Sequence, residues 1–224
     1  MIKCAIFDLD GTLVDSMSYW EKAPIEFSLR KNIEPEEKLS DTFLSMSLFS
    51  FSKYFKEKYH LEDTIDSIMS EIDSIMEVHY VRDINVKKGM FDLIEMLDKE
   101  NVKLAIATQT DKYLVEKVLK KTGLDKYFSF ILTCGEVGEA KSSPLVYEGC
   151  ANHFNIPYNK TLVFEDLPYG IESSKKKGFI TIGLFDVPSI KHQERIKESA
   201  DYYFLEMNSD SIKFIEKLVK KSLD

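Results

Sequence analysis

Cysteine is scarce in this sequence, and its few copies lie far apart. The chain has three cysteines, Cys4, Cys134 and Cys150, and no Cys-x-x-Cys pair. An odd number of widely separated cysteines does not predict a disulfide framework. Disulfides are typical of oxidising compartments, so their absence favours a reducing, cytoplasmic location.

Long apolar runs are missing as well. The opening stretch MIKCAIFDLD reaches charged side chains before the apolar core of a signal peptide could form. No later stretch has the roughly 20 consecutive apolar residues that a membrane helix needs. The sequence therefore predicts no membrane partner and agrees with a cytoplasmic location.

Positive charge is in deficit. Lysine and arginine number 30 against 38 aspartates and glutamates, which leaves a formal net charge of −8. An acidic surface repels the phosphate backbone of nucleic acids, so we expect no nucleic-acid partner. A small anionic substrate remains compatible with this charge, because the field inside a site can differ in sign from that of the whole surface.

What the chain does contain is typical of a globular protein. Apolar residues make up 44% and charged residues 30%, which excludes a disordered or fibrous class. A length of 224 residues is enough for a main domain with a smaller insert.

Short apolar runs alternate with helix-length segments through most of the chain. This alternation predicts an α/β fold with a Rossmann-like parallel sheet flanked by helices, because buried parallel strands are short and apolar throughout. The predicted strands are 2–7, 104–108, 130–133, 161–165, 180–184 and, more weakly, 201–204.

The region between the first two strands has a different pattern and is predicted to be helical throughout. Its best segment repeats apolar residues every three or four positions, which makes one apolar stripe on a helix. We expect an α/β core domain, 1–15 with 83–224, and an all-α domain at 16–82 inserted after the first strand. The stripe consists of Ile65, Ile68, Met69, Ile72, Ile75 and Met76.

Two acids and a glycine follow the first predicted strand. Residues two apart in an extended chain point the same way, so Asp8 and Asp10 are expected to project together. They fall at the carboxyl end of the strand, where open α/β sheets bind ligands. Gly11 permits a tight turn behind them. A single acid would suit a simple strand end, but the pair predicts a functional site.

Four segments, in order along the chain, resemble the motifs of the haloacid dehalogenase-like (HAD) superfamily. The resemblance covers essentially the whole chain. The helical insert also lies where the small α-helical cap of the phosphoglycolate phosphatase and β-phosphoglucomutase branch lies. The matching segments are Asp8-x-Asp10-Gly11-Thr12, Thr108 at a strand end, Lys141 before a Ser-Ser-Pro helix start, and Glu165-Asp166 followed by Gly170.

The resemblance implies a phosphatase that uses Mg²⁺. Asp8 is then the nucleophile that forms an aspartyl-phosphate, and Asp10 is the general acid and base. The metal ligands implied are Asp8, the backbone carbonyl of Asp10, and Asp166, with Glu165 a direct or an indirect ligand. Oxygen donors of this kind are the ones that Mg²⁺ prefers.

The resemblance also implies a set of phosphate-binding groups. Thr108 and Lys141 are expected to hold the phosphate oxygens and to fix the line of attack. Backbone N–H groups of the turn that ends at Thr12 are expected to assist. Gln109 departs from the smaller residues usual after Thr108, and it either donates to a substrate oxygen or crowds the pocket.

Three alternatives stay open. A β-phosphoglucomutase-like mutase has a histidine where this chain has Trp20 and an arginine in the cap, whereas residues 46–49 contain no arginine. A haloacid dehalogenase needs neither Asp10 nor the metal. A non-catalytic binding protein would not need the full set of motifs. We therefore expect a small phosphorylated metabolite as the partner, and a monomer or weak homodimer.

Overall fold

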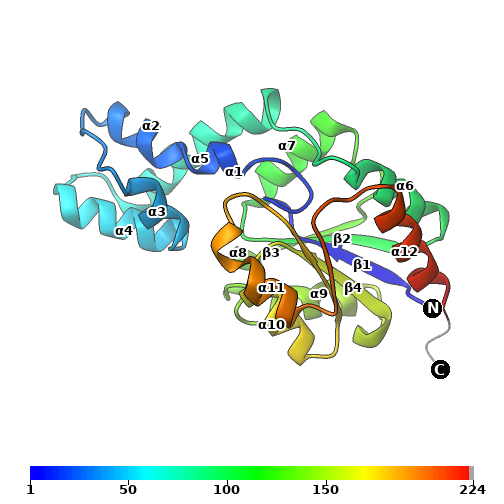
Figure 1. Ribbon diagram of the computed structural model, residues 1–224. Helices are drawn as coiled ribbons and strands as arrows, with labels where there is room; N and C mark the ends of the chain where they lie inside the picture. The colour runs from blue at the N-terminus through cyan, green and yellow to red at the C-terminus, as the bar shows by residue number, and fades with distance from the viewer. Residues whose placement is uncertain (222–224) are drawn as a thin grey trace. The chain divides into compact units, whose positions relative to one another are not determined.

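Within residues 1–221, which the computed structural model describes, six strands form one parallel sheet in the order β3-β2-β1-β4-β5-β6 (Figure 1). This sheet confirms the predicted α/β class. Residues 222–224, the end of the predicted core domain, lie outside the described part. The strands are β1 Cys4–Phe7, β2 Lys103–Thr108, β3 Phe130–Thr133, β4 Thr161–Glu165, β5 Ile180–Leu184 and β6 Tyr202–Phe204.

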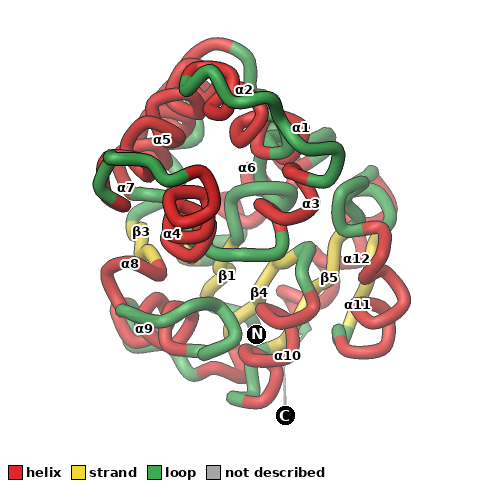
Figure 2. The backbone as a smooth tube through the Cα atoms, turned by 90° about the vertical axis from the view of Figure 1, so that its left-hand side faces the viewer, coloured by secondary structure: helices red, strands yellow, loops and turns green. Residues whose placement is uncertain are grey.

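The order of the strands reverses at the centre of the sheet. The chain builds outward from β1 through β2 to β3, then crosses to the other side of β1 and continues from β4 to β6. Phe7 pairs with both Ile106 and Phe164, so β1, β2 and β4 end at nearly the same level. Figure 2 shows β3, β1, β4 and β5 in this order across the sheet, in which β2 pairs with both β3 and β1. In such a fold, ligands bind at the carboxyl edge beside the reversal.

Helices cover both faces of the sheet, as a Rossmann-like core requires. Figure 1 shows α6 and α12 on one face and α9 and α10 on the other. Most of the strand residues are fully buried between them. The helices of this domain are α6 Met90–Lys99, α7 Lys112–Thr122, α8 Cys134–Val137, α9 Leu145–His153, α10 Pro168–Lys176, α11 Gln193–Ser199 and α12 Ser209–Lys220, with short 3₁₀ turns at Tyr158–Lys160 and Ile190–His192.

All three cysteines are buried in the core of the sheet domain. Cys4 and Cys150 lie fully buried in one apolar cluster between β1 and α9, and Cys134 lies at its edge. Burial raises the pKa of the Cys150 and Cys4 thiols, because the thiolate is poorly solvated there. These cysteines therefore serve as small apolar packing groups.

A second compact unit, Ser16–Ile84, is entirely helical and follows β1. The first unit consists of Met1–Asp15 and the chain from Asn85 onward. The stripe predicted on α5 packs inward, since Ile68, Ile72, Ile75 and Met76 are all buried. The helices of the second unit are α1 Met17–Trp20, α2 Ala23–Arg30, α3 Leu39–Leu44, α4 Leu48–Tyr59 and α5 Ile65–Arg82.

Aromatic rings hold the helical unit together. Phe51 contacts both Phe43 and Phe55, with ring centroids 4.8 and 5.6 Å apart, and Phe55 contacts Phe27 at 5.1 Å. Contacts between rings at such distances add to the stabilisation from burial. The unit therefore has an apolar core of its own.

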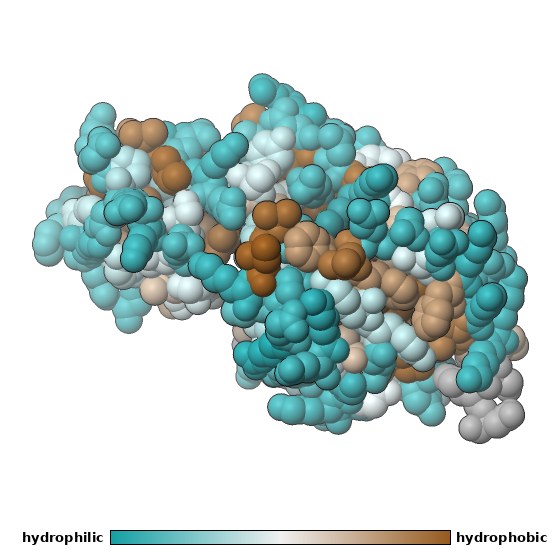
Figure 3. All heavy atoms as spheres, in the orientation of Figure 1, coloured by the Kyte–Doolittle hydropathy of each residue, from teal (hydrophilic) through white to brown (hydrophobic). Residues whose placement is uncertain are grey.

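The surface drawn in Figure 3 is largely hydrophilic and carries patches of hydrophobic side chains. In the sheet domain, Val187, Ile190 and Leu205, in the segments that follow β5 and β6, are more than half exposed. Among the described residues, no helix combines the length and the apolar character needed to cross a membrane.

Candidate active site

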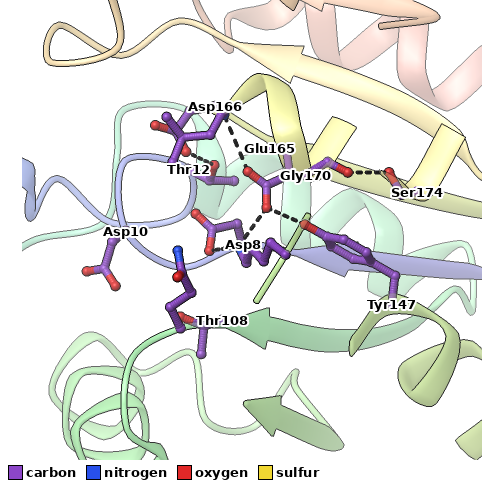
Figure 4. A network of polar contacts seen from close by, with 12 residues as sticks. Asp8, Asp10, Thr12, Thr108, Tyr147, Glu165, Asp166, Gly170 and Ser174 are labelled. Atoms are coloured by element: carbon purple, nitrogen blue, oxygen red, sulfur yellow. Dashed lines mark hydrogen bonds and ion pairs between the residues drawn. The ribbon is translucent and has the colours of Figure 1, made fainter. Parts of the chain in front are cut away.

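Polar side chains from the ends of three strands meet at the carboxyl edge of the sheet (Figure 4). Asp8 directly follows β1, Thr108 ends β2, and Glu165 ends β4 with Asp166 next to it. All four side chains are nearly or completely buried. They meet because parallel neighbouring strands end at the same edge of a sheet, and β1 lies between β2 and β4.

Lys141 reaches this cluster from the loop between α8 and α9. Its Nζ donates to Asp8 Oδ1 and, at 2.6 Å, to Glu165 Oε1, and the lysine is only 2% exposed. Burial by itself would lower the pKa of Lys141, but the Asp8 and Glu165 carboxylates raise it above its ordinary value. The Ser173 hydroxyl donates to the Lys141 carbonyl at 2.6 Å and helps to hold the loop. Lys141 is therefore a fixed, charged group.

The acids outnumber the buried cation. Asp8, Glu165 and Asp166 each place one oxygen within 4.8 Å of the others, and Lys141 is the cation bonded among them. Burial raises the pKa of Asp8 to about 7, although Lys141 opposes the shift, and Glu165 and Asp10 add to it. Burial and the neighbouring Asp8 and Glu165 also raise the pKa of Asp166 well above its usual range.

This arrangement fits a divalent cation. Excess buried negative charge is unfavourable unless a positive ion or a proton compensates it. Carboxylate oxygens are the donors that Mg²⁺ prefers. Asp8 and Asp166 offer such oxygens within the cluster. Lys141 bonds one oxygen of Asp8, whereas both oxygens of Glu165 already accept hydrogen bonds, Oε1 from Lys141 and Oε2 from the Leu167 N–H.

The turn after Asp8 packs closely against Asp166. Gly11 has a φ of +83°, and a Cβ there would lie 2.7 Å from Asp166 Oδ2. Only glycine fits this conformation and this contact. The Thr12 hydroxyl donates to Asp166 Oδ1 at 3.1 Å, and the Gly11 N–H donates to the Val14 carbonyl at 3.0 Å. Thr12 therefore helps to hold the Asp166 carboxylate in place. Its predicted contact with phosphate stays a prediction.

Asp10 lies apart from the three clustered acids. It is half-buried, and its Oδ2 accepts from the Thr110 hydroxyl at 2.5 Å. Figure 4 shows its carboxylate extending away from Glu165 and Asp166. This position suits a proton-transfer group better than a carboxylate ligand of a cation, and the metal contact through the Asp10 carbonyl stays a prediction.

Thr108, which ends β2, and Gln109, which follows it, differ in solvent exposure. Thr108 is 1% exposed, and its Oγ1 accepts from the Thr110 N–H at 3.1 Å. Gln109 is exposed, and its Nε2 lies 3.4 Å from the Tyr169 hydroxyl. The predicted contacts of Thr108 and Gln109 with substrate oxygens stay predictions.

Tyr147 is a site residue that sequence reasoning missed. Its hydroxyl donates at 2.6 Å to Glu165 Oε1, the same oxygen that Lys141 contacts (Figure 4). Gly170 makes room for this pair, since a Cβ there would lie 2.6 Å from the Tyr147 hydroxyl and 2.7 Å from Glu165. In the sequence, Tyr147 looks like an ordinary residue on the apolar face of a helix, and no pattern predicts that its hydroxyl contacts Glu165.

Replacing Tyr147 with Phe removes this hydrogen bond and little else. Glu165 and Asp8 share the Lys141 ammonium group, so loosening Glu165 also disturbs Asp8, a proposed ligand of the cation. We therefore expect Mg²⁺ affinity to fall about tenfold, the usual scale for losing a group that orients the surroundings of a metal ligand. Stability should fall by about 1–2 kcal/mol, since the bond is to a charged, buried acceptor. Calorimetric titration with Mg²⁺ and urea denaturation measure the two effects. Tyr158→Phe, whose hydroxyl lies 3.4 Å from Asn152 Oδ1 on the surface, is the matched control. Equal Mg²⁺ affinity in both variants would contradict an orienting role for Tyr147.

Comparisons with known proteins find relatives in sequence and in fold. A curated relative, validoxylamine A 7'-phosphate phosphatase from Streptomyces hygroscopicus subsp. limoneus, is 23% identical over 192 residues, covering 82% of this chain and 86% of its own. Two solved structures share the fold. CbbY from Rhodobacter sphaeroides in complex with phosphate has a TM-score of 0.82 at 21% identity, covering 93% of this chain and 96% of its own. β-Phosphoglucomutase from Clostridium difficile has a TM-score of 0.76 at 19% identity, covering 97% and 98%.

The family is shown by its sequence model. The model described as haloacid dehalogenase-like hydrolase matches residues 5–184, a span that includes every predicted site residue. This match confirms the resemblance noted in the motifs. The chain therefore belongs to the haloacid dehalogenase-like hydrolase family.

Proposed function

We propose that this protein is a Mg²⁺-dependent phosphatase that hydrolyses a small-molecule phosphate monoester through an aspartyl-phosphate on Asp8. The observation that carries the proposal is the cluster of Asp8, Glu165 and Asp166 around Lys141 at the strand reversal. A curated relative whose name describes a phosphatase supports the same reaction class.

In the first half-reaction, Asp8 attacks the phosphorus of the substrate. The bond from phosphorus to the ester oxygen breaks as the bond to the Asp8 oxygen forms. Asp10 donates a proton to the departing oxygen, which makes it a better leaving group. Lys141 and Thr108 hold phosphate oxygens near Asp8 and stabilise the charge that they carry in the transition state.

In the second half-reaction, water attacks the aspartyl-phosphate. Asp10, now deprotonated, takes a proton from the water, and the bond between phosphorus and the Asp8 oxygen breaks. Inorganic phosphate leaves, and Asp8 and Asp10 regain their starting states. The Thr110 hydroxyl on Asp10 Oδ2 holds the carboxylate in one orientation for both proton transfers.

The cation would be held by Asp8, the Asp10 carbonyl and Asp166, and it would neutralise charge on the phosphate and the acids. Glu165 acts mainly on Lys141, because its Oε1 accepts from both Lys141 and Tyr147. Without that contact, Lys141 would be bonded to Asp8 alone and would pair more tightly with the nucleophile.

We assign the helical unit Ser16–Ile84 the role of a cap that selects the substrate. A mutase is the second candidate, because a β-phosphoglucomutase shares the fold. Trp20 occupies the position of the histidine in that branch. Its indole N–H donates to the Tyr80 hydroxyl at 3.0 Å, and its ring lies 6.0 Å from that of Phe43. Trp20 is thus a packing residue of the helical unit, which favours hydrolysis.

The proposal is tested with p-nitrophenyl phosphate in the presence of Mg²⁺ or of a chelator. We expect hydrolysis with Mg²⁺ and at least about a 100-fold lower rate with chelator, since a bound cation contributes several kcal/mol to the transition state. A panel of metabolite phosphates, followed by NMR, separates release of phosphate from isomerisation of a sugar phosphate. Activity that is indifferent to the chelator would overturn the metal requirement. Isomerisation without phosphate release would establish the mutase.

A further inference from the structure

A fourth acid, Asp186, lies beside the cluster and is used by none of the steps above. It follows β5 by two residues and is only 5% exposed. Its Oδ1 accepts from Lys87 Nζ at 2.7 Å. Lys87 itself lies just before α6, so the pair joins two segments of the sheet domain that are 99 residues apart in sequence.

Lys87 holds Asp186 in place because it also bonds two backbone carbonyls next to this acid. Besides Asp186, its Nζ donates to the Gly11 carbonyl at 2.5 Å and to the Phe185 carbonyl at 2.7 Å. These three acceptors use all three protons of the ammonium group. The turn that carries Asp10 and the loop after β5 are therefore tied to the same cation.

The second oxygen of Asp186 is in a different situation. Asp186 Oδ2 is buried and has no hydrogen-bond partner in the described part of the chain. It lies 3.1 Å from the point where a Cβ on Gly11 would stand, and Asp166 Oδ2 lies 2.7 Å from that same point. The free oxygen of Asp186 thus faces the acid cluster across Gly11.

An unpartnered carboxylate oxygen in this place is costly. A buried acceptor without a donor loses its hydration, and a second negative charge beside Asp166 adds repulsion. Lys87 and the backbone N–H of Val187 offset part of this charge, but Lys87 donates to Oδ1, and Oδ2 has no donor at hydrogen-bond geometry in the described part of the chain. A donor that arrives together with a cation would satisfy the free oxygen.

We propose that Asp186, oriented by Lys87, accepts a hydrogen bond from a water molecule on the divalent cation and thereby strengthens binding of that cation. This inference rests on the proposed function, which places the cation on Asp8 and Asp166. Mg²⁺ keeps several of its waters when bound, and each water can donate to a carboxylate near the site. Asp186 is in this sense a positioning residue and makes no contact with substrate.

The test is Asp186→Asn, with Mg²⁺ binding measured by calorimetry in the absence of substrate. The amide oxygen can still accept from Lys87, so the NH₂ group then faces Asp166 and cannot accept from water. We expect Mg²⁺ affinity to fall about tenfold or more. The rise in melting temperature that Mg²⁺ produces should shrink accordingly. Asp186→Ser, which also lacks the carboxylate, serves if the first variant does not fold.

The matched control is Asp201→Asn. Asp201 also pairs with a lysine, Lys175 at 2.9 Å, but it bonds Thr181 in the first half of β5, away from the carboxyl edge. We expect this variant to lose stability and to keep its Mg²⁺ affinity. If Asp186→Asn only lowers the melting temperature and binds Mg²⁺ like the unaltered protein, Asp186 serves only to hold the loop after β5 against Lys87, and the inference is wrong. If the unaltered protein itself binds no Mg²⁺, the proposed function fails, and this inference with it.

Discussion

Replacing Asp8 with Asn is expected to abolish phosphate-ester hydrolysis, with a fall in kcat of about 10⁴-fold or more. Loss of the nucleophile in enzymes that use covalent catalysis costs this much or more, since the remaining groups cannot replace the missing step. The amide has the shape of the carboxylate but does not attack phosphorus. Release of phosphate from p-nitrophenyl phosphate measures the effect.

The same variant has a second expected result, which separates chemistry from misfolding. Burial raises the pKa of Asp8 to about 7, so the charged carboxylate is disfavoured in the metal-free protein. The amide side chain of the Asp8→Asn variant removes that charge, and its oxygen can still accept from Lys141. We therefore expect the melting temperature of Asp8→Asn in chelator to exceed that of the unaltered protein.

The control for this experiment is Asp210→Asn, a change of the same kind at an exposed position near the start of α12. It should leave kcat unchanged. Activity of Asp8→Asn within tenfold of the unaltered protein would remove Asp8 from the role of nucleophile, whatever its melting temperature.

Replacing Lys141 with Met is expected to have the largest effect on stability. Methionine keeps most of the length of the side chain but leaves Asp8 and Glu165 without their shared cation. Removing one member of a buried ion pair costs about 3–5 kcal/mol, because the remaining charge is buried and uncompensated. Activity should fall at least about 10²–10³-fold, since Lys141 is also proposed to hold a phosphate oxygen.

Urea denaturation in chelator and in Mg²⁺ measures this loss. We expect Mg²⁺ to recover part of the stability, because a cation on Asp8 and Asp166 replaces some of the lost positive charge. Lys112→Met is the matched control, since Lys112 pairs with Glu136 at 3.3 Å on the surface, and such pairs contribute at most about 1 kcal/mol. Equal urea midpoints for the two variants would show that Lys141 does not neutralise the buried acids.

Much of the fold was predictable because its signals are local. Each of the six predicted runs overlaps a strand of the sheet, and their apolar character follows from burial between two layers of helices. Three starts differ slightly from the prediction. β1 begins at Cys4, β2 at Lys103 and β6 at Tyr202, whereas the predicted runs begin at residues 2, 104 and 201. Such shifts arise because a strand end depends on where its partner strand begins to pair.

Part of the site was predictable for a related reason. Asp8, Thr108, Glu165 and Asp166 each follow or end a predicted strand, and parallel strands bring such positions to a common edge without any knowledge of the loops. Lys141 was predicted as a site residue from its motif alone. Its contacts with Asp8 and Glu165 depend on the conformation of its loop, where the Ser173 hydroxyl donates to the Lys141 carbonyl.

By itself, the sequence determined the class of fold, the acids at the strand ends and the family that they indicate, because hydrophobic period and residue type at a strand end are local properties. Only the tertiary structure decided which oxygen each donor reaches. Three of these hydrogen bonds join separate segments of the chain: Tyr147 donates to Glu165, Thr110 to Asp10 and Lys87 to Asp186. A hydrogen bond requires positions correct to a few tenths of an ångström, which packing and loop conformation set and residue spacing does not.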